Sequence, residues 1–132
     1  ECVYCGALNT KLQVEHLIMF NRSEYGLHHP GNIAPVCAGC NRRRKDENNK
    51  YLSWEMHLEQ ICRENNDLNS FFTRKKKIQL HMTEGEFKYP ELNEAENHAI
   101  RVIANSLYEN IKTESEKALK MYQELDSAFV KR

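Results

Sequence analysis

Apolar residues change their spacing along the chain, and the first pattern predicts a pair of strands. Residues 12–18 read Leu-Gln-Val-Glu-His-Leu-Ile, so apolar and polar side chains alternate before the stretch ends apolar. This alternation predicts a strand with Leu12 and Val14 on one face. Residues 33–36 predict a short second strand, and residues 21–32 between them are rich in Asn, Ser, Gly and Pro, which predicts a loop.

Helical spacing replaces this alternation in the second third of the chain. Residues 41–48 contain no helix breaker and predict a helix that begins at the second Cys pair. Ser53 is a candidate N-cap for a further helix. The apolar face of that helix would be formed by Trp54, Leu58, Ile61 and Cys62. Residues 68–82 continue the apolar series and predict a helix followed by extended chain.

From about residue 90 a long apolar stripe falls at helical spacing. It consists of Leu92, Ala95, Ala99, Val102, Ile103, Leu107, Ile111, Ala118, Met121, Tyr122, Leu125 and Phe129. Thr113 with Glu116 resembles a capping box, so we expect a new helix or a kink there. A straight helix of about 40 residues would span about 60 Å, more than a small core can cover. The stripe therefore indicates either a helical hairpin or contact with another chain, in a homodimer or with a larger protein partner.

Composition bounds the class of protein. The 132 residues suit about one domain, and 40% apolar with 29% charged residues suits a polar, mostly helical one. No apolar run approaches the roughly 20 residues that span a bilayer, and no signal segment opens the chain. We therefore expect an intracellular, cytoplasmic protein without a membrane contact. Because the sequence begins with Glu rather than Met, we also expect more protein upstream.

The net charge is zero, but the charges are divided unevenly along the chain. Residues 1–77 hold 12 Lys and Arg against 9 Asp and Glu, whereas residues 78–132 hold 7 against 10. The first part contains two basic runs, Arg42-Arg43-Arg44-Lys45 and Arg74-Lys75-Lys76-Lys77. Contact with phosphate is therefore expected in the first part. A solvated helix face is the alternative reading of the second run.

Four of the five cysteines form two pairs of identical spacing, Cys2-x-x-Cys5 and Cys37-x-x-Cys40. Matched pairs with a leftover thiol and no secretion signal do not favour disulfides. They favour a tetrahedral zinc ion, because each tight turn presents two thiolates to the same metal. We therefore predict a structural four-cysteine zinc site and expect Cys62 to be a small buried apolar residue.

The 31 residues 6–36 between the pairs exceed the 15–20 of an ordinary zinc ribbon, and they carry candidate chemistry. His16 is a candidate general base that takes a proton from water. Glu15 and Asn41 offer oxygen ligands, which suit Mg²⁺ or Mn²⁺ better than zinc. Bland alternatives are a core histidine at His16, a turn residue at Asn32 and a helix N-cap at Asn41. His28 and His29 lie in the predicted loop, where solvation is favoured over contact with phosphate or assistance to the site. His57, His81 and His98 are assigned no role.

Glu15-His16, Asn32 in a Gly-Asn-Ile context, and Cys40-Asn41 followed by basic residues together resemble the HNH endonuclease family over about residues 2–46. The resemblance implies a ββα-metal fold with flanking zinc knuckles, in the variant with Asn at the third signature position. It also implies that the amide of Asn32 holds the loop and strand that orient His16. Glu15 stands where the family often has Asp, and Arg44 where Lys is frequent.

The expected fold is α+β and predominantly helical. A zinc-stapled ββα-metal nuclease core would occupy residues 1–50, and a helical extension for packing, substrate or partner contact would occupy residues 51–132. The expected function is metal-dependent hydrolysis of DNA by His16, Asn32 and Asn41, leaving 5′-phosphate and 3′-hydroxyl ends as the resemblance implies. The expected nucleic-acid contacts are Arg42, Arg43, Arg44 and Lys45. Alternatives are a non-catalytic zinc module that binds nucleic acid or a protein, and an RNA-cleaving toxin; restriction and phage defence are among the roles of such modules.

Overall fold

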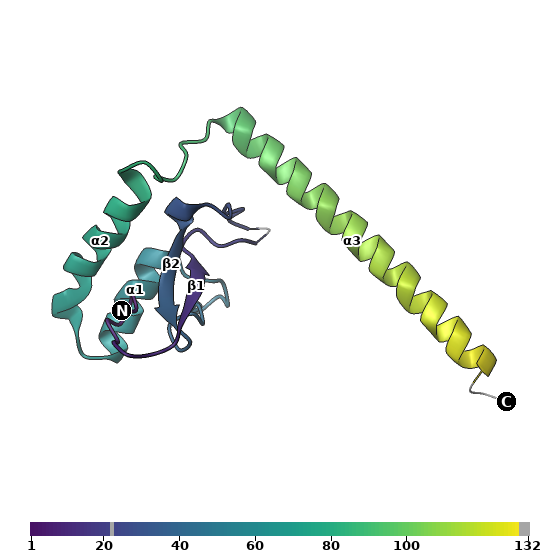
Figure 1. Cartoon of the computed structure of the whole chain (residues 1–132), viewed down its shortest axis with the longest axis horizontal. Coiled ribbons are helices and arrows are strands. Elements are labelled where there is room, and N and C mark those ends of the chain that lie inside the picture. The colour runs from purple at the N-terminus through teal and green to yellow at the C-terminus, as the bar shows by residue number, and fades with distance from the viewer. Residues whose placement is uncertain (22, 130–132) are drawn as a thin grey trace. The chain divides into compact units, whose positions relative to one another are not determined.

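The computed structural model describes residues 1–21 and 23–129 of the chain (Figure 1). The chain forms two compact units, Glu1–Glu91 and Leu92–Arg132. The first unit contains a two-stranded sheet and the helices α1 (Trp54–Glu64) and α2 (Phe71–Thr83), and the second contains α3 (Glu94–Phe129). The expected α+β, predominantly helical class with a C-terminal helix is therefore confirmed.

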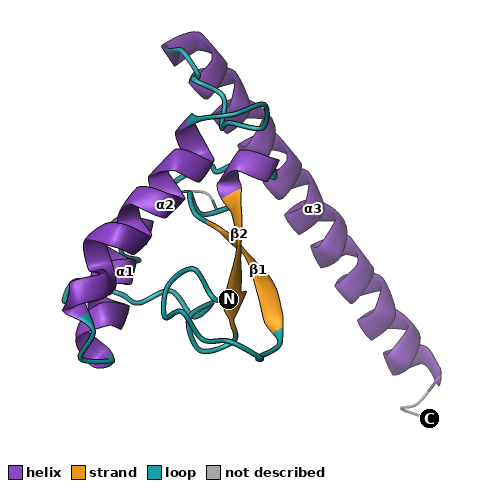
Figure 2. Cartoon of the chain, turned by 60° about the vertical axis from the view of Figure 1, so that its left-hand side comes forward, coloured by secondary structure: helices purple, strands orange, loops and turns teal. Residues whose placement is uncertain are grey.

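The sheet pairs β1 (Leu12–His16) with β2 (Ile33–Cys37) in antiparallel register. Leu12 lies opposite Cys37 and His16 lies opposite Ile33, so the end of β1 meets the start of β2. The predicted order of strand, loop and strand is confirmed. Figure 2 shows the two strands crossing with the pronounced twist expected of a two-stranded ribbon.

The helix predicted over residues 41–48 is wrong. The chain instead makes a tight reversal in which Lys45 pairs with Tyr51 as an isolated antiparallel bridge. The side chain of Asp46 stabilises this reversal, because its Oδ1 accepts hydrogen bonds from the backbone N–H groups of Asn48 (2.9 Å) and Lys50 (3.0 Å). Asn49 adopts the left-handed conformation with φ 61°, which Asn tolerates. Side chain to backbone bonds of this kind compete with helix formation.

The helix that completes the core comes later, as α1. The side chain of Ser53 accepts from the N–H of Met56, which confirms the predicted N-cap, and the helix stops at Asn65. Figures 1 and 2 both show α1 and α2 on the same side of the sheet. The core lies there, and its fully buried side chains include Tyr4, Leu17, Val36, Leu58 and Ile61. The compact unit thus extends to residue 91, and a functional boundary at residue 50 stays a prediction.

Helix α2 replaces the mixed helix and extended chain expected over residues 68–82, and Arg74 fixes it to the N-terminal turn. The guanidinium donates to the backbone oxygen of Tyr4 and to the carboxylate of Asp67, both at 3.0 Å. Gly6 has φ +74°, and a Cβ placed there would lie 2.8 Å from Nη2 of Arg74. Glycine suits this turn because of its backbone angle, and a larger residue would also force the guanidinium of Arg74 to shift.

The second unit is a single continuous helix from residue 94. Asn93 and Glu96 form its capping box, since the side chain of Asn93 accepts from the N–H of Glu96 at 2.8 Å. The new helix expected near Thr113 is not formed, and the hairpin alternative is wrong. Over residues 94–129 no side chain of α3 is buried, so its apolar stripe faces solvent. No helix in the described part of the chain is long and apolar enough to cross a membrane.

Replacing Leu58 with Ala tests whether α1 belongs to the core. Leu58 is fully buried, so we expect the free energy of unfolding to fall by about 3 kcal/mol. The exposed neighbour Met56, replaced with Ala, is the control and should change it by less than about 0.5 kcal/mol. Urea unfolding followed by fluorescence of Trp54, the only tryptophan, reports on this unit alone. Equal effects of the two substitutions would contradict the assignment of α1 to the core.

Candidate active site

The two Cys pairs converge on one point, although 31 residues separate them. The ligand atoms of Cys2, Cys5, Cys37 and Cys40 all lie within 4.8 Å of one another, and Sγ of Cys5 lies 3.8 Å from Sγ of Cys37. Four sulfurs at this spacing suit a tetrahedral ion with Zn–S bonds of about 2.3 Å. The arrangement supports the predicted structural zinc site.

The pKa values of the thiols in this cluster also favour a bound cation. A hydrogen bond from the Cys40 thiol lowers the pKa of Cys2 to about 4. The same contact, together with burial, raises the pKa of Cys40 well above its ordinary value. Within this pair a thiolate is thus favoured at Cys2 and a second one is opposed at Cys40. A divalent ion removes this opposition, because a coordinating thiol is deprotonated by the metal.

His57, to which the sequence assigned no role, supports the second Cys pair from α1. It is fully buried, its Nδ1 accepts from the N–H of Arg44 at 3.1 Å, and its Nε2 lies 2.8 Å from the backbone oxygen of Cys40. Since Nδ1 accepts, the proton is on Nε2 and is donated to Cys40. Burial lowers the pKa of His57 to about 4, so the ring is held neutral. No signal in the sequence distinguishes this residue from other helical histidines.

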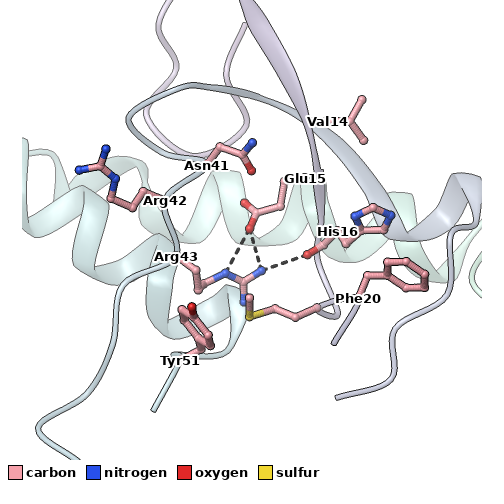
Figure 3. A pocket seen from close by; sticks show the side chains of 9 residues that line it. Val14, Glu15, His16, Phe20, Asn41, Arg42, Arg43 and Tyr51 are labelled. Atoms are coloured by element: carbon pink, nitrogen blue, oxygen red, sulfur yellow. Dashed lines mark hydrogen bonds and ion pairs between the residues drawn. The ribbon is translucent and has the colours of Figure 1, made fainter. Parts of the chain in front are cut away.

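A cavity of about 430 Å³ opens beside the sheet, and five of the predicted site residues line it: Glu15, His16, Asn41, Arg42 and Arg43. Figure 3 shows Glu15, His16 and Asn41 around this cavity, with Phe20 and Tyr51 at two of its sides. Consecutive strand residues alternate between faces, so Glu15 turns inward while the imidazole of His16 turns toward Phe20. The structure therefore brings the three residues to one cavity but directs the carboxylate and the imidazole to different parts of it.

Glu15 forms a buried ion pair with Arg43. Both nitrogens Nε and Nη2 of Arg43 donate to Oε1 of Glu15, at 3.1 and 2.9 Å, and the two residues are 6% and 5% exposed. Arg43 also donates to the backbone oxygens of His16, Leu17 and Leu52. Burial raises the pKa of Glu15 above its ordinary value, and the Arg43 guanidinium opposes that shift. Arg43 is thus enclosed and engaged within the unit, and its expected contact with nucleic acid stays a prediction.

The other oxygen of Glu15 provides the test of whether a hard cation fits this site. Oε2 is buried and makes no hydrogen bond of ordinary geometry among the described residues, but the buried hydroxyl of Tyr4, which is likewise without one, interacts with the same carboxylate and shifts its pKa. Either this hydroxyl or a cation can satisfy the oxygen. Asn41 lines the same cavity and uses its Nδ2 to donate to Oε1 of Gln13 at 2.8 Å, which leaves its amide oxygen available. Two oxygen donors suit Mg²⁺, which completes its shell with water and substrate phosphate.

His16 is accompanied by His28, for which the sequence favoured loop solvation over assistance to the site. Nε2 of His16 and Nδ1 of His28 are 2.9 Å apart, so one ring donates a hydrogen bond to the other. The ring of Phe20 stacks on His16 with centroids 5.4 Å apart and planes 25° apart. Burial and the neighbouring His28 lower the pKa of His16. The imidazole is therefore neutral near pH 7, as a proton acceptor must be.

Asn32 is completely buried and fastens the loop between the strands. Its Oδ1 accepts from the N–H of Ile18 at 2.7 Å, and its Nδ2 donates to the backbone oxygens of Ile18 (2.9 Å) and Leu27 (2.8 Å). These three bonds hold the chain directly after His16 against the segment that bears His28. The position agrees with the orienting role that the resemblance implies, and the role itself stays a prediction.

The remaining basic residues of the first run differ in availability. Arg44 pairs with Glu64 at 2.9 Å and donates to two backbone oxygens, so its charge is committed. Arg42 is exposed and lines the cavity. Lys45 is exposed and holds its ammonium 4.7 Å from the ring centroid of Tyr51. Within the described residues neither Arg42 nor Lys45 forms an ion pair, so these two are the available phosphate contacts.

Most residues of the second basic run, Arg74-Lys75-Lys76-Lys77, form ion pairs or pack within the unit. Arg74 binds Asp67 and the N-terminal turn, Lys75 pairs with Glu55 at 3.1 Å, and Lys77 pairs with Glu1 at 3.3 Å. Lys76 and Lys77 are exposed, so part of this run is a solvated helix face, and contact with phosphate there stays a prediction. The main role of the run in the structure is to connect α2 to the rest of the unit.

Comparison with known proteins adds one match. Residues 2–47 match the protein-family model described as HNH endonuclease, which confirms the resemblance for about a third of the chain. No curated protein and no solved structure matches the chain.

Replacing Cys37 with Ser tests the zinc site. We expect the wild-type protein to carry about one zinc per chain and the variant to carry none and to unfold at a markedly lower temperature, because metal ligation supplies folding free energy. Metal analysis by mass spectrometry after exhaustive dialysis measures the first effect and a thermal scan the second. Cys62, which is buried outside the cluster, is the control: Cys62→Ala should keep its zinc. A folded, zinc-loaded Cys37→Ser protein would remove the assignment.

Replacing Arg43 with Met tests the buried ion pair. The substitution leaves the carboxylate of Glu15 buried without its counter-charge, and we expect a loss of about 3 kcal/mol in the free energy of unfolding. Lys76→Met on the exposed surface of α2 is the matched control and should cost less than about 0.5 kcal/mol. Urea unfolding monitored by Trp54 fluorescence gives both values. If Arg43→Met is as stable as the control, the pair does not hold this part of the fold together.

Proposed function

We propose that this chain, with its HNH endonuclease match at residues 2–47, is a metal-dependent nuclease that hydrolyses DNA phosphodiester bonds. The observation that carries the proposal is the cavity lined by His16, Glu15 and Asn41, which groups a neutral imidazole with two hard oxygen donors. A module that only binds nucleic acid needs no such grouping.

In this mechanism His16 takes the proton from the attacking water. His28 is its positioning residue: when Nε2–H of His16 donates to Nδ1 of His28, the other ring nitrogen, Nδ1 of His16, is left free to accept the proton. The same hydrogen bond stabilises the imidazolium that forms, because the acceptor faces the ring as its charge develops. Asn32 fixes the loop behind both rings through its three hydrogen bonds to the backbone.

Glu15 and Asn41 are the residues that would hold the divalent ion, through Oε2 and the amide oxygen respectively. The ion would supply positive charge to the phosphate oxygens and to the leaving oxygen. Arg43 keeps the carboxylate of Glu15 in place through the opposite oxygen. Arg42 and Lys45 would neutralise flanking phosphates and set the direction of the strand.

Cleavage of a supercoiled plasmid and of labelled oligonucleotides tests the proposal. With Mg²⁺ we expect nicking that yields 5′-phosphate ends, and we expect none when Mg²⁺ is omitted. His16→Ala should lower the rate by at least about 100-fold, the usual contribution of a general base. The exposed His98 of α3 provides the matched control, since His98→Ala removes a histidine far along the sequence from the cavity residues.

Two readings accompany the assay so that its outcome is unambiguous. Zinc content is measured before and after Mg²⁺ is removed, because loss of the structural ion would stop cleavage for a different reason. RNA of the same sequence is included as a substrate. Equal rates for His16→Ala and His98→Ala would refute His16 as the base, and exclusive cleavage of RNA would replace DNA by the alternative substrate.

A further inference from the structure

Two exposed aromatic rings stand at the cavity that the nuclease proposal uses. Phe20 is 70% exposed and Tyr51 is 52% exposed, and both line the same cavity as His16 (Figure 3). Single exposed apolar residues are common on protein surfaces. Two aromatic rings at one polar cavity are a different feature, because each ring offers a flat face where a substrate would lie.

Phe20 is supported from one side only. Its ring lies on the imidazole of His16 at 5.4 Å in a nearly parallel stack, and most of its remaining surface is open. A flat group placed on the open face would extend the stack of His16 and Phe20 by one layer. Nucleobases are the flat groups that a nuclease substrate provides, and stacking of a base on an aromatic side chain is worth about 1–3 kcal/mol.

Tyr51 lies in the tight chain reversal that the structure has in place of the helix expected over residues 41–48. The bridge between Lys45 and Tyr51 fixes the ring at the rim of the cavity, and the ammonium of Lys45 lies 4.7 Å from the ring centroid. An aromatic face and a cation thus occur together at one place. A single-stranded nucleic acid presents the matching pair, a base and its phosphate.

The charges of the chain also favour binding through bases. The net charge is zero, and Arg43, Arg44, Arg74, Lys75 and Lys77 are all engaged in ion pairs. Affinity for an intact duplex comes mainly from neutralised phosphates, and Arg42 and Lys45 alone supply few of these at the cavity. In a duplex the base faces are covered by their neighbours, so Phe20 and Tyr51 would contribute nothing to binding it.

We propose that the substrate is DNA with unpaired bases, and that Phe20 and Tyr51 are the stacking residues that select it. This inference rests on the proposed nuclease function and names the substrate class of the same cavity. Bases on the strand that enters the cavity stack on the open face of Phe20 and on the face of Tyr51 that the Lys45 ammonium leaves free, while Arg42 and Lys45 contact the adjoining phosphates. The enzyme then prefers single-stranded DNA, or single-stranded segments of a larger DNA, over intact duplex.

Binding is measured independently of cleavage, in buffer without Mg²⁺. A single-stranded oligonucleotide that contains 2-aminopurine reports stacking directly, because its fluorescence is quenched when the base stacks on an aromatic ring. We expect the wild-type protein to quench it and to bind the single strand on the order of 10-fold more tightly than the matching duplex. Phe20→Ala and Tyr51→Ala should each weaken binding on the order of 10-fold and reduce the quench.

Matched variants separate stacking from loss of bulk or of fold. Phe20→Leu keeps an apolar side chain but no aromatic face, and should behave like Phe20→Ala. Phe72 is 76% exposed on α2 outside the cavity, so Phe72→Ala should bind like the wild type. Retained zinc and an unchanged thermal midpoint show that each variant is folded. Loss of binding in Phe72→Ala to the same extent as in Phe20→Ala would overturn the assignment of the stacking residues.

Cleavage of single-stranded, duplex and RNA substrates with Mg²⁺ then distinguishes the two proposals. Faster cleavage of single-stranded DNA, lost in Phe20→Ala through a raised KM, supports the inference. Equal cleavage of single strand and duplex with unchanged binding by both variants overturns it and leaves the nuclease standing. Absence of cleavage from every substrate, with Phe20-dependent quenching intact, overturns the nuclease proposal instead. Tighter binding of RNA than of DNA overturns the choice of DNA.

Discussion

The guanidinium of Arg43 joins two segments of the chain. One is the strand β1, which bears the candidate general base His16, and the other is the segment that follows the second Cys pair. The guanidinium binds Oε1 of Glu15 and the backbone oxygens of His16 and Leu17 on one side, and of Leu52 on the other. The segment directly after Cys40 forms no helix, so these hydrogen bonds, rather than the packing of a helix, hold it against the strand. They place Asn41 and Arg42, which directly precede Arg43, at the cavity.

The thiolate cluster and this ion pair act on the same small unit from two ends. The cluster ties the N-terminal turn to the end of β2, and Arg43 ties the end of β1 to the segment beyond. Few apolar side chains are fully buried between them, so burial alone supplies limited free energy. Metal ligation and a saturated buried pair fix the geometry that so small a core leaves under-determined.

Local patterns predicted much of this architecture, and long-range pairing explains the rest. The two strands, the Cys cluster and the Ser53 cap follow from alternation, ligand spacing and capping chemistry, which are readable within a few residues. The helix over residues 41–48 was wrong because Asp46 bonds its own backbone, a competition that propensity does not resolve. The partner of Glu15 is 28 residues away, and neither charge shows in the sequence that it will be buried. Leu12 and Val14 are exposed because Glu15 takes the inward face of β1, and the burial of Glu15 likewise does not show in the sequence.

Under the two proposals, the loop between the strands would connect catalysis with substrate choice in one element. It carries Phe20 near its start and His28 near its end, and both contact His16. Asn32 holds the two ends together through Ile18 and Leu27, and the N–H of Leu27 donates in addition to the hydroxyl of Tyr89 at 3.1 Å. A base stacked on Phe20 would therefore press on the ring that accepts the proton, so binding an unpaired base and orienting His16 become one event. The net charge of the protein supplies little general attraction to DNA. Such coupling gives a reason for placing Phe20 against His16, the proton acceptor, rather than elsewhere on the surface.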